Sequence, residues 1–529
     1  MSDEIQSRSE ATPAGYDTKY VVGQDNVEFW GFDVHNPVFV VSGLVIIAFV
    51  SVSLALPGET KIFFEGLRNG LTSSLDWLFI LAGNVFVLFA LYLIVSPFGE
   101  IRLGGPNAKP EFSFTGWLAM LFAAGMGIGL MFFGVLEPVA HFQKPPLFVS
   151  TANVEEARDV AMAATIFHWG LHPWAIYAVV GLSLAFFSYN RGLPLTIRSV
   201  FYPVFGDAVW GWPGHIIDIL AVFATLFGLA TSLGFGAEQA MAGMNYLFGI
   251  PATDTNKVIL IAVITGMATL SVVAGLDAGV KRLSEINMSL AFALLLFVII
   301  AGPTVAIATG FFSNLANYIW NIVPLSSPFG RDEAFLHGWT TFYWAWWISW
   351  SPFVGMFIAR VSRGRTVREF VVCVLIVPTL VSVLWMTTFG GTALVQLIQG
   401  GYTGVADTVT NWQPELALFK MLEQLPMASV LSFVGIVLVV VFFVTSSDSG
   451  SLVIDTITAG GKMNPPVGQR VFWAVFEGLV AMTLMLGGGL ASLQAAAIAT
   501  GFPFTLVLLA MCYSTYVGLR AEQRQMAGA

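Results

Sequence analysis

The chain is poor in charged residues and in cysteine, and both shortages limit what it can be. Of its 529 residues, 10% are charged and only two are cysteines, Cys373 and Cys512, each within an apolar segment. Two such residues form neither a disulfide framework nor a cluster of metal ligands, so we expect both to be small packing residues. The net charge of −9 excludes a general role in binding nucleic acids.

Motifs of soluble enzymes are absent as well. The sequence has no Gly-x-Ser-x-Gly elbow, no phosphate-binding P-loop, no HExxH pair and no paired catalytic carboxylates, so we expect neither an enzyme nor a bound cofactor. The first 35 residues are polar and have no basic stretch before the first apolar run. We therefore expect no cleavable signal peptide.

What the chain has in abundance is apolar residues. It is 56% hydrophobic with a mean hydropathy of +0.78, which predicts an all-α polytopic membrane protein embedded in a lipid bilayer. We expect a cytoplasmic N-terminal tail (1–35), a twelve-helix domain (36–520) and a short cytoplasmic C-terminal tail (521–529). The twelve predicted spans are 37–56, 77–96, 116–139, 160–187, 215–237, 256–276, 284–310, 338–360, 369–397, 427–453, 468–489 and 491–517.

The distribution of lysine and arginine predicts the orientation of these spans. Sixteen of these residues fall on one side of the predicted membrane and seven on the other, which places both termini in the cytoplasm. Between the seventh and eighth spans, residues 311–324 are apolar with interspersed asparagine. We expect this segment to form an amphipathic helix on the outer surface.

One aromatic stretch stands out. Five of the 16 tryptophans lie between Trp339 and Trp350, and the Ser351-Pro352 pair that follows is expected to interrupt the helix. Helical spacing places Phe342, Trp346, Trp350 and Phe353 on one face, and Tyr343 and Trp347 on a second. Aromatic faces in a dry cavity suit a quaternary ammonium ion, which carries charge but no hydrogen-bond donor. The alternatives are core packing and interface anchoring.

A second unusual segment lies in the third span, where Gly125, Gly127 and Gly129 alternate with larger residues. Glycines at this spacing weaken a helix and allow the backbone to unwind, which is tolerated at membrane depth only beside a cavity or within protein. Close helix packing is the alternative. The third and eighth spans each begin a set of five, so spans 3–7 and 8–12 are expected to be inverted halves, with breaks at 125–129 and 349–353.

Four segments together resemble the betaine/carnitine/choline transporter family. They are GMGIGLMFFGVLEPVAHF (125–142), FHWGLHPWAIYAVVGL (167–182), FYWAWWISWSPFVGMFIARVSRGR (342–365) and FFVTSSDSG (442–450). The resemblance implies a LeuT-like five-plus-five inverted repeat preceded by two extra helices. It also implies a homotrimer in a bacterial-type inner membrane, with contacts from the amphipathic helix before the eighth span.

The same resemblance implies an aromatic box for a trimethylammonium group, formed by Trp169, Trp174, Tyr177 and Trp347. We expect Pro173 to break the helical register so that both tryptophans of the fourth span face one cavity. By resemblance, Trp346 and Trp350 line the cytoplasmic exit, whereas Phe342 and Phe353 act in gating. Exposed amides of Gly125, Gly127 and Gly129 are expected to meet a substrate carboxylate.

The expected function is therefore import of a quaternary-ammonium solute, with a role in osmoprotection. Choline carriers of the family tend to have aspartate where this chain has Gly129, which favours a zwitterion: glycine betaine first, then carnitine or dimethylsulfoniopropionate. Choline remains possible. A membrane sensor that binds such ligands without moving them is the alternative of another class.

The coupling ion is expected to be Na⁺, with H⁺ as the alternative. The positions that match the family's sodium ligands are Ala123, Met126, Phe442, Thr445 and Ser446. A second sodium site is doubtful, because the chain keeps Thr225 but has Leu229 at the second threonine position.

Buried ionisable residues near the box have two interpretations each. His168 and His172 are expected to pack and hydrogen-bond, with a proton-linked role second. Glu137 and Asp448 are expected to fix helices, with a role in gating second.

Overall fold

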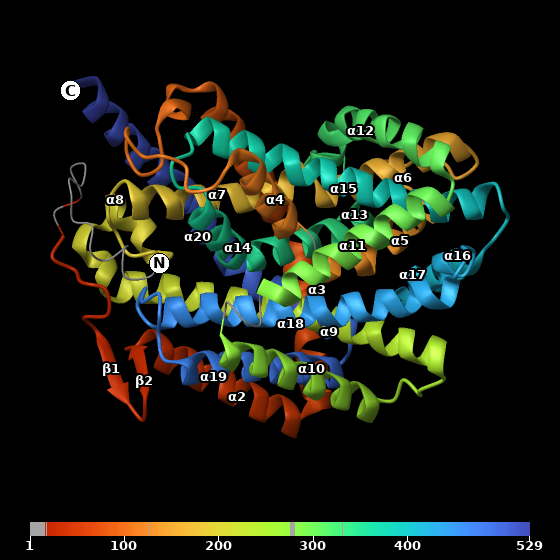
Figure 1. Cartoon of the computed structure of the whole chain (residues 1–529), viewed down its shortest axis with the longest axis horizontal. Coiled ribbons are helices and arrows are strands. Elements are labelled where there is room, and N and C mark those ends of the chain that lie inside the picture. Colours follow the sequence, from red (N-terminus) through yellow and green to blue (C-terminus); the bar gives the residue numbers. More distant parts are fainter. Residues whose placement is uncertain (1–15, 17, 126, 276–280, 331, 529) are drawn as a thin grey trace.

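The computed structural model describes residues 16–528 except Asp17, Met126, 276–280 and Arg331, and this part of the chain is predominantly helical. Ten of its helices are long and apolar enough to cross a membrane. They run roughly alongside one another in stacked layers (Figure 1). Every predicted span overlaps one or two helices. The protein is thus a multi-pass, helical membrane protein, as predicted.

The first elements are β1 (Asn26–Phe29), β2 (Phe32–His35), α2 (Val38–Ala55), α3 (Pro57–Val95), η1 (Pro97–Glu100), α4 (Phe114–Gly125), α5 (Ile128–Gln143), α6 (Val154–Trp169), α7 (Leu171–Tyr189), η2 (Arg198–Phe201), α8 (Tyr202–Phe205), η3 (Gly206–Trp210), α9 (Trp212–Phe248), α10 (Asp254–Ala274) and α11 (Lys281–Ala301). The remaining elements are α12 (Thr304–Ser326), α13 (Glu333–Phe335), η5 (Leu336–Thr340, a π-helical turn), α14 (Thr341–Val361), α15 (Val367–Ile398), α16 (Gly404–Thr410), η6 (Pro414–Leu416), α17 (Ala417–Leu422), α18 (Ala428–Thr458), α19 (Val467–Leu486) and α20 (Leu490–Gly528).

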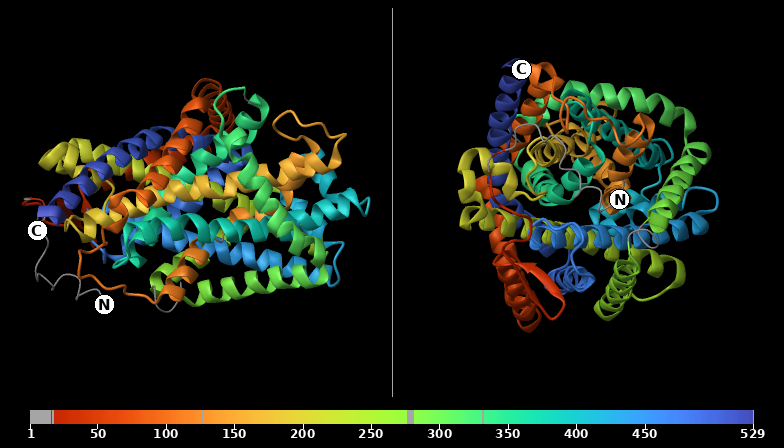
Figure 2. Two further views of the ribbon diagram at one scale, coloured as in Figure 1. Left: turned by 90° about the horizontal axis from the view of Figure 1, so that it is seen from above. Right: turned by 60° about the vertical axis from the view of Figure 1, so that its left-hand side comes forward.

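The segment expected to be an N-terminal tail ends in a folded hairpin. Strands β1 and β2 pair antiparallel, with Asn26 opposite His35. The Asn26 side chain donates to the carbonyl of Ala459, and Asp33 forms an ion pair with Lys462. These contacts attach the hairpin to the α18–α19 connection. The hairpin lies at the same end of the molecule as the end of α20 (Figure 2).

The glycine-rich third span is interrupted, as its sequence predicts. Helix α4 ends at Gly125 and α5 begins at Ile128. Between them Gly127 is fully extended, with φ −170° and ψ −178°. Met126 lies outside the described residues.

The fourth span is also interrupted, but three residues before the predicted point. Helix α6 ends at Trp169 and α7 starts at Leu171, so that Gly170 (φ −101°, ψ −129°) forms the break. Pro173 lies in the first turn of α7, where proline is tolerated because its missing N–H has no helical partner there. The freed Leu171 N–H donates to the hydroxyl of Tyr318 on α12 over 3.0 Å.

The predicted interruption at Ser349–Phe353 is wrong. Helix α14 continues through Pro352. Proline cannot donate to the carbonyl four residues before it, that of Ile348. The hydroxyl of Ser351 donates to this carbonyl instead, over 2.7 Å, so the helix keeps its hydrogen bond. The irregular turn of this span lies before α14 and is the π-helical η5.

Helix α14 lies at the centre of the packing. It contacts α7, α9, α20 and α3, and its Trp344 and Trp346 are each 1% exposed. The amphipathic helix predicted at 311–324 is present as the longer α12, on which Trp320 is 84% exposed. Helix α12 lies along one edge of the molecule, over α15 and α6 (Figure 1). The buried α14 therefore presents its aromatic residues to a protein interior and not to lipid.

Candidate functional site

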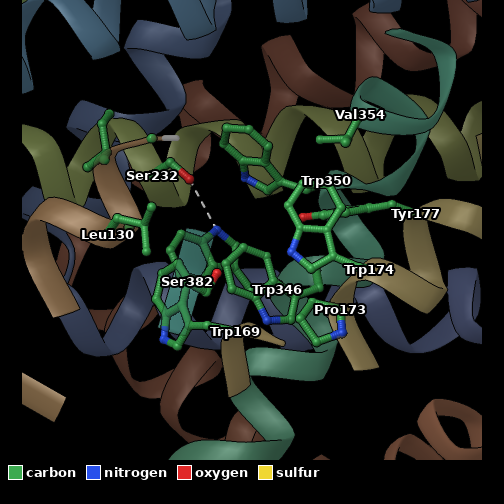
Figure 3. Close-up of a pocket in the computed structure, with 14 residues that line it drawn as sticks. Leu130, Trp169, Pro173, Trp174, Tyr177, Ser232, Trp346, Trp350, Val354 and Ser382 are labelled. Carbon is green, nitrogen blue, oxygen red and sulfur yellow. Dashed lines mark hydrogen bonds between the residues drawn. The ribbon is translucent and has the colours of Figure 1, made fainter. Parts of the chain in front are cut away.

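A small cavity of about 50 Å³ lies where the two interrupted helices meet α14 (Figure 3). The start of α5 forms one wall, the break between α6 and α7 forms a second, and α14 forms a third; α9 and α15 each add one serine. Its lining residues are Gly127, Ile128, Gly129, Leu130, Trp169, Pro173, Trp174, Tyr177, Ser232, Trp346, Trp347, Trp350, Val354 and Ser382.

All four residues predicted to form the aromatic box line this cavity. The centroids of Trp169 and Trp347 are 4.9 Å apart with their planes at 76°. Trp347 and Tyr177 meet at 6.3 Å and 80°, and Tyr177 and Trp174 at 5.3 Å and 76°. In each of these near-perpendicular pairs the edge of one ring meets the face of the next, which is a favoured geometry for aromatic side chains.

The indole N–H groups of three cavity tryptophans are already bonded to protein. Trp347 donates to the carbonyl of His168 over 2.9 Å, and Trp350 donates to the carbonyl of Gly228 over 2.9 Å. Trp346 donates to the hydroxyl of Ser232 over 3.1 Å, the dashed line in Figure 3. Because these donors are occupied, the rings offer the cavity their π systems. Such walls favour a cation that needs no hydrogen bond.

The first turn of α5 supplies the polar part of the cavity. Gly127, Ile128, Gly129 and Leu130 all line it, and the first N–H groups of a helix have no partner within the helix. This end of α5 carries partial positive charge, which suits a carboxylate. A side chain at Gly129 would displace the rings, because a Cβ there would lie 2.6 Å from Trp169 Cη2 and 2.9 Å from Trp346 Cη2. Gly125, also predicted here, is the last residue of α4.

The remaining aromatic predictions divide into two groups. Trp346 and Trp350, predicted to line the cytoplasmic exit, both line the cavity. Phe342 and Phe353 do not: Phe342 stacks on Trp346 at 5.4 Å, and Phe353 contacts Trp350 at 5.3 Å. Both therefore form a layer behind the lining rings. Ser232 and Ser382 were not predicted from the sequence, since a single serine in an apolar helix carries no distinguishing signal.

A buried carboxylate stands behind the box. Glu137 on α5 is fully buried, and its Oε2 accepts hydrogen bonds from Trp169 Nε1 at 2.8 Å and from Tyr343 Oη at 2.6 Å. Its Oε1 lies 2.5 Å from His168 Nδ1 and 3.1 Å from His141 Nε2. His168 also bonds Thr340 through Nε2 at 2.9 Å. Glu137, His141 and His168 have the residue types of a metal site, but their donor atoms are engaged with one another.

His172 and Asp448 lie outside this network. His172 is buried, bonds Asn84 at 3.1 Å and stacks on Trp344, as expected of a packing residue. Asp448, on α18, accepts from the hydroxyl of Ser271 on α10 over 2.6 Å. It thus joins two helices away from the cavity.

Four of the five residues predicted to bind sodium lie on α4 or α18. Helix α18 is continuous through Phe442, Thr445 and Ser446. The Thr445 hydroxyl donates to carbonyls of its own helix, those of Val441 at 3.0 Å and Phe442 at 3.2 Å. Ala123 is in the last turn of α4, and Met126 is outside the described residues.

At the doubtful second site, Thr225 donates to the carbonyl of Ala221 over 2.7 Å. Leu229 is fully buried against α18. It lies so close to Gly450 that a Cβ on this glycine would be 2.2 Å from the leucine Cδ1. The position of the second threonine is therefore filled by an apolar side chain in close packing.

Comparison with known proteins agrees with this architecture. The model of the betaine/carnitine/choline family transporters matches residues 37–524. A glycine betaine/proline/choline transporter of Vibrio parahaemolyticus is 60% identical over 96% of this chain and 95% of its own length. Glycine betaine transporter 1 of the same organism is 57% identical, over 96% of this chain and 98% of its own. A glycine betaine/proline/choline/ectoine transporter of that organism is 53% identical, over 96% and 91%.

These matches extend over nearly the whole chain and include every helix that lines the cavity. The chain therefore belongs to the betaine/carnitine/choline family of membrane transporters, and it is not an enzyme.

Proposed function

We propose that this protein imports a quaternary-ammonium zwitterion, with glycine betaine as the first candidate, and that the cavity of Figure 3 is its substrate site. The observation that carries the proposal is that Trp169, Trp174, Tyr177 and Trp347 all line one cavity. A desolvated cation–π contact contributes up to about 2 kcal/mol. Several rings around one trimethylammonium group therefore account for micromolar binding, which needs about 8 kcal/mol together with the other contacts.

Two features favour a zwitterion as the substrate. The α5 N-terminus opens into the cavity beside the rings, so a carboxylate and an ammonium group can bind at neighbouring places. Gly129 leaves no space for an acidic side chain that would compete with the substrate carboxylate. The named specificities of the Vibrio relatives, glycine betaine among them, support the same substrate class.

Choline is the second candidate substrate, because two of these relatives are named for choline as well as for glycine betaine. Carnitine and dimethylsulfoniopropionate share the onium group and follow. A different kind of function is a membrane sensor that binds these ligands without transporting them. Counterflow of labelled betaine in proteoliposomes distinguishes the two, because a carrier shows counterflow and a sensor does not.

We infer that Na⁺ drives uptake, with H⁺ as the alternative. The sodium assignment rests on the family positions Ala123, Met126, Phe442, Thr445 and Ser446. For Thr445 to bind the ion, its hydroxyl lone pairs must face the cation while its proton stays on the helix carbonyls. Packing of Leu229 against Gly450 argues for a single sodium site.

The finer architecture is proposed on the same family basis. We propose twelve membrane crossings in two inverted sets of five after α2 and α3, and a homotrimer in a bacterial inner membrane with both termini cytoplasmic. The exposed aromatic residues of α12, Phe312 and Trp320, are suited to contacts between subunits. A role in osmoprotection follows from the substrate class.

The decisive experiment is uptake into proteoliposomes. Betaine, choline, carnitine and dimethylsulfoniopropionate are each supplied with an inward Na⁺ gradient, with K⁺ in its place, and with an imposed pH gradient. Betaine accumulation that requires Na⁺ supports the proposal. Accumulation driven by the pH gradient alone would assign H⁺ coupling, and preference for choline over betaine would overturn the substrate assignment.

A further inference from the structure

We infer that Glu137 is a positioning residue of the substrate site, which holds two aromatic side chains in place and provides a fixed negative charge behind them. The inference rests on the proposed function, because it takes the cavity as the site of a quaternary ammonium group. Glu137 itself does not line the cavity. It acts through Trp169 and Tyr343.

The hydrogen bonds of Glu137 come from three helices. His141 lies one turn further along α5, His168 and Trp169 are at the end of α6, and Tyr343 is on α14. Four polar side chains surround this carboxylate, two at each oxygen. Of the residues that the structure describes, only His141 and His168 come within ion-pair distance of it.

The two bonds to Oε2 fix ring orientation. Trp169 forms a wall of the cavity, and Tyr343 stacks on Trp347 with centroids 6.0 Å apart. Without this oxygen, both donors would be buried with no acceptor, which is costly in a dry interior. The rings would turn to find other partners, and the geometry of the box would change.

The negative charge of Glu137 also affects how strongly the cavity binds an ammonium group. An indole that donates to an anion gains electron density on its ring, which strengthens its attraction for a cation. Glu137 lies nine residues after Ile128, which places it about 13.5 Å along α5 from the helix N-terminus. The cavity thus has partial positive charge at one end and a carboxylate behind the aromatic walls. A zwitterion aligned with this field has its carboxylate at Gly129 and its ammonium group against Trp169.

This arrangement predicts a difference between ligands. Betaine keeps its contact with the α5 N-terminus when Glu137 is neutralised, whereas choline has no carboxylate and depends on the rings and the fixed charge. Glu137→Gln is therefore expected to weaken choline binding at least tenfold and betaine binding by a smaller factor. The effect should be on the dissociation constant and KM, because the lost charge acts on the ligand when it binds, before transport begins.

The experiment measures betaine and choline binding by tryptophan fluorescence in purified wild-type protein, Glu137→Gln, Glu137→Asp, Tyr343→Phe and the control His172→Gln. The control is another buried side chain, on α7, and its contacts are with Asn84, Phe167 and Trp344. We expect the control to retain wild-type affinity. Glu137→Asp keeps the charge but shortens the reach, so it should recover part of the choline affinity lost in Glu137→Gln.

A folded Glu137→Gln protein with wild-type affinity for both ligands would overturn the inference. Equal weakening of both ligands would leave positioning but remove the role of the charge. If Glu137→Gln does not fold, Tyr343→Phe provides the test, since it removes one hydrogen-bond donor to Glu137 and keeps the ring. Tyr343→Phe should weaken ligand binding about threefold to tenfold. Unchanged binding would contradict the inference. Absence of betaine and choline binding in the wild-type protein would instead refute the proposed function.

Discussion

The most direct test of the cavity is a single methyl group at Gly129. In Gly129→Ala the new Cβ would lie 2.6 Å from Trp169 Cη2. Ordinary contact begins at 3.4 Å, so the ring must retreat by about 0.8 Å. Trp169 cannot do so freely because its indole N–H is held by Glu137 over 2.8 Å, and Trp346 on the other side is held by Ser232. Neither ring beside the new methyl group can therefore move easily to make space for it.

Overpacking of this kind costs about 1–3 kcal/mol. If the strain is relieved by displacement of the box, betaine affinity should fall by about 5-fold to 150-fold, at 1.4 kcal/mol for each factor of ten. Isothermal titration calorimetry on the purified protein measures the loss, and thermal unfolding of the same sample reports any loss of stability.

Gly266→Ala on α10 is the control. A Cβ at Gly266 meets nothing within 4 Å, and Gly266 is not among the residues that line the cavity. We expect its affinity to remain within about twofold of wild type, well below the loss expected from overpacking. If Gly129→Ala binds as tightly as Gly266→Ala while folded, the rings are not fixed as described, and the reasoning fails.

Three further predictions concern other parts of the molecule. Trp347→Ala should abolish betaine uptake in proteoliposomes while Trp347→Phe keeps part of it, because phenylalanine retains a ring face; equal uptake by both would show that the ring is not a wall of the site. Ser351→Ala should lower the unfolding temperature in detergent, since it leaves the Ile348 carbonyl unpaired at a cost of about 1–3 kcal/mol, whereas the exposed Thr309→Ala should not. Thr445→Ala should raise the Na⁺ concentration for half-maximal uptake at least tenfold, and unchanged Na⁺ dependence would exclude Thr445 as a ligand.

The tryptophans of α14 could be predicted because tryptophan is rare in the middle of an apolar span. The break in the third span could be predicted for a similar reason, since alternate glycines have few other uses in a helix. The other residues of the box, Trp169, Trp174 and Tyr177, could be predicted only from the resemblance of their segment to the family. The break in the fourth span was misplaced, because proline is the more obvious signal while Gly170 is the residue with the open backbone. Local composition thus predicts that a helix is interrupted better than it predicts which residue forms the break.

The continuity of α14 could not be predicted from composition. Proline normally disrupts a helix, and only the rotamer of Ser351 shows that its hydroxyl replaces the missing donor. The network of Glu137 was hidden for another reason. Its partners Trp169 and Tyr343 are 32 and 206 residues away along the chain, so no local pattern brings them together.

The tethered indoles have a consequence for which solutes the protein can accept. The indoles of Trp346, Trp347 and Trp350 each donate a hydrogen bond to another helix. These rings are therefore already ordered in the folded protein, and binding of a solute costs little further side-chain entropy. An onium group with ethyl arms in place of methyl arms would have to detach at least one anchor to fit. The compound's bulk, and not its charge, would then exclude it.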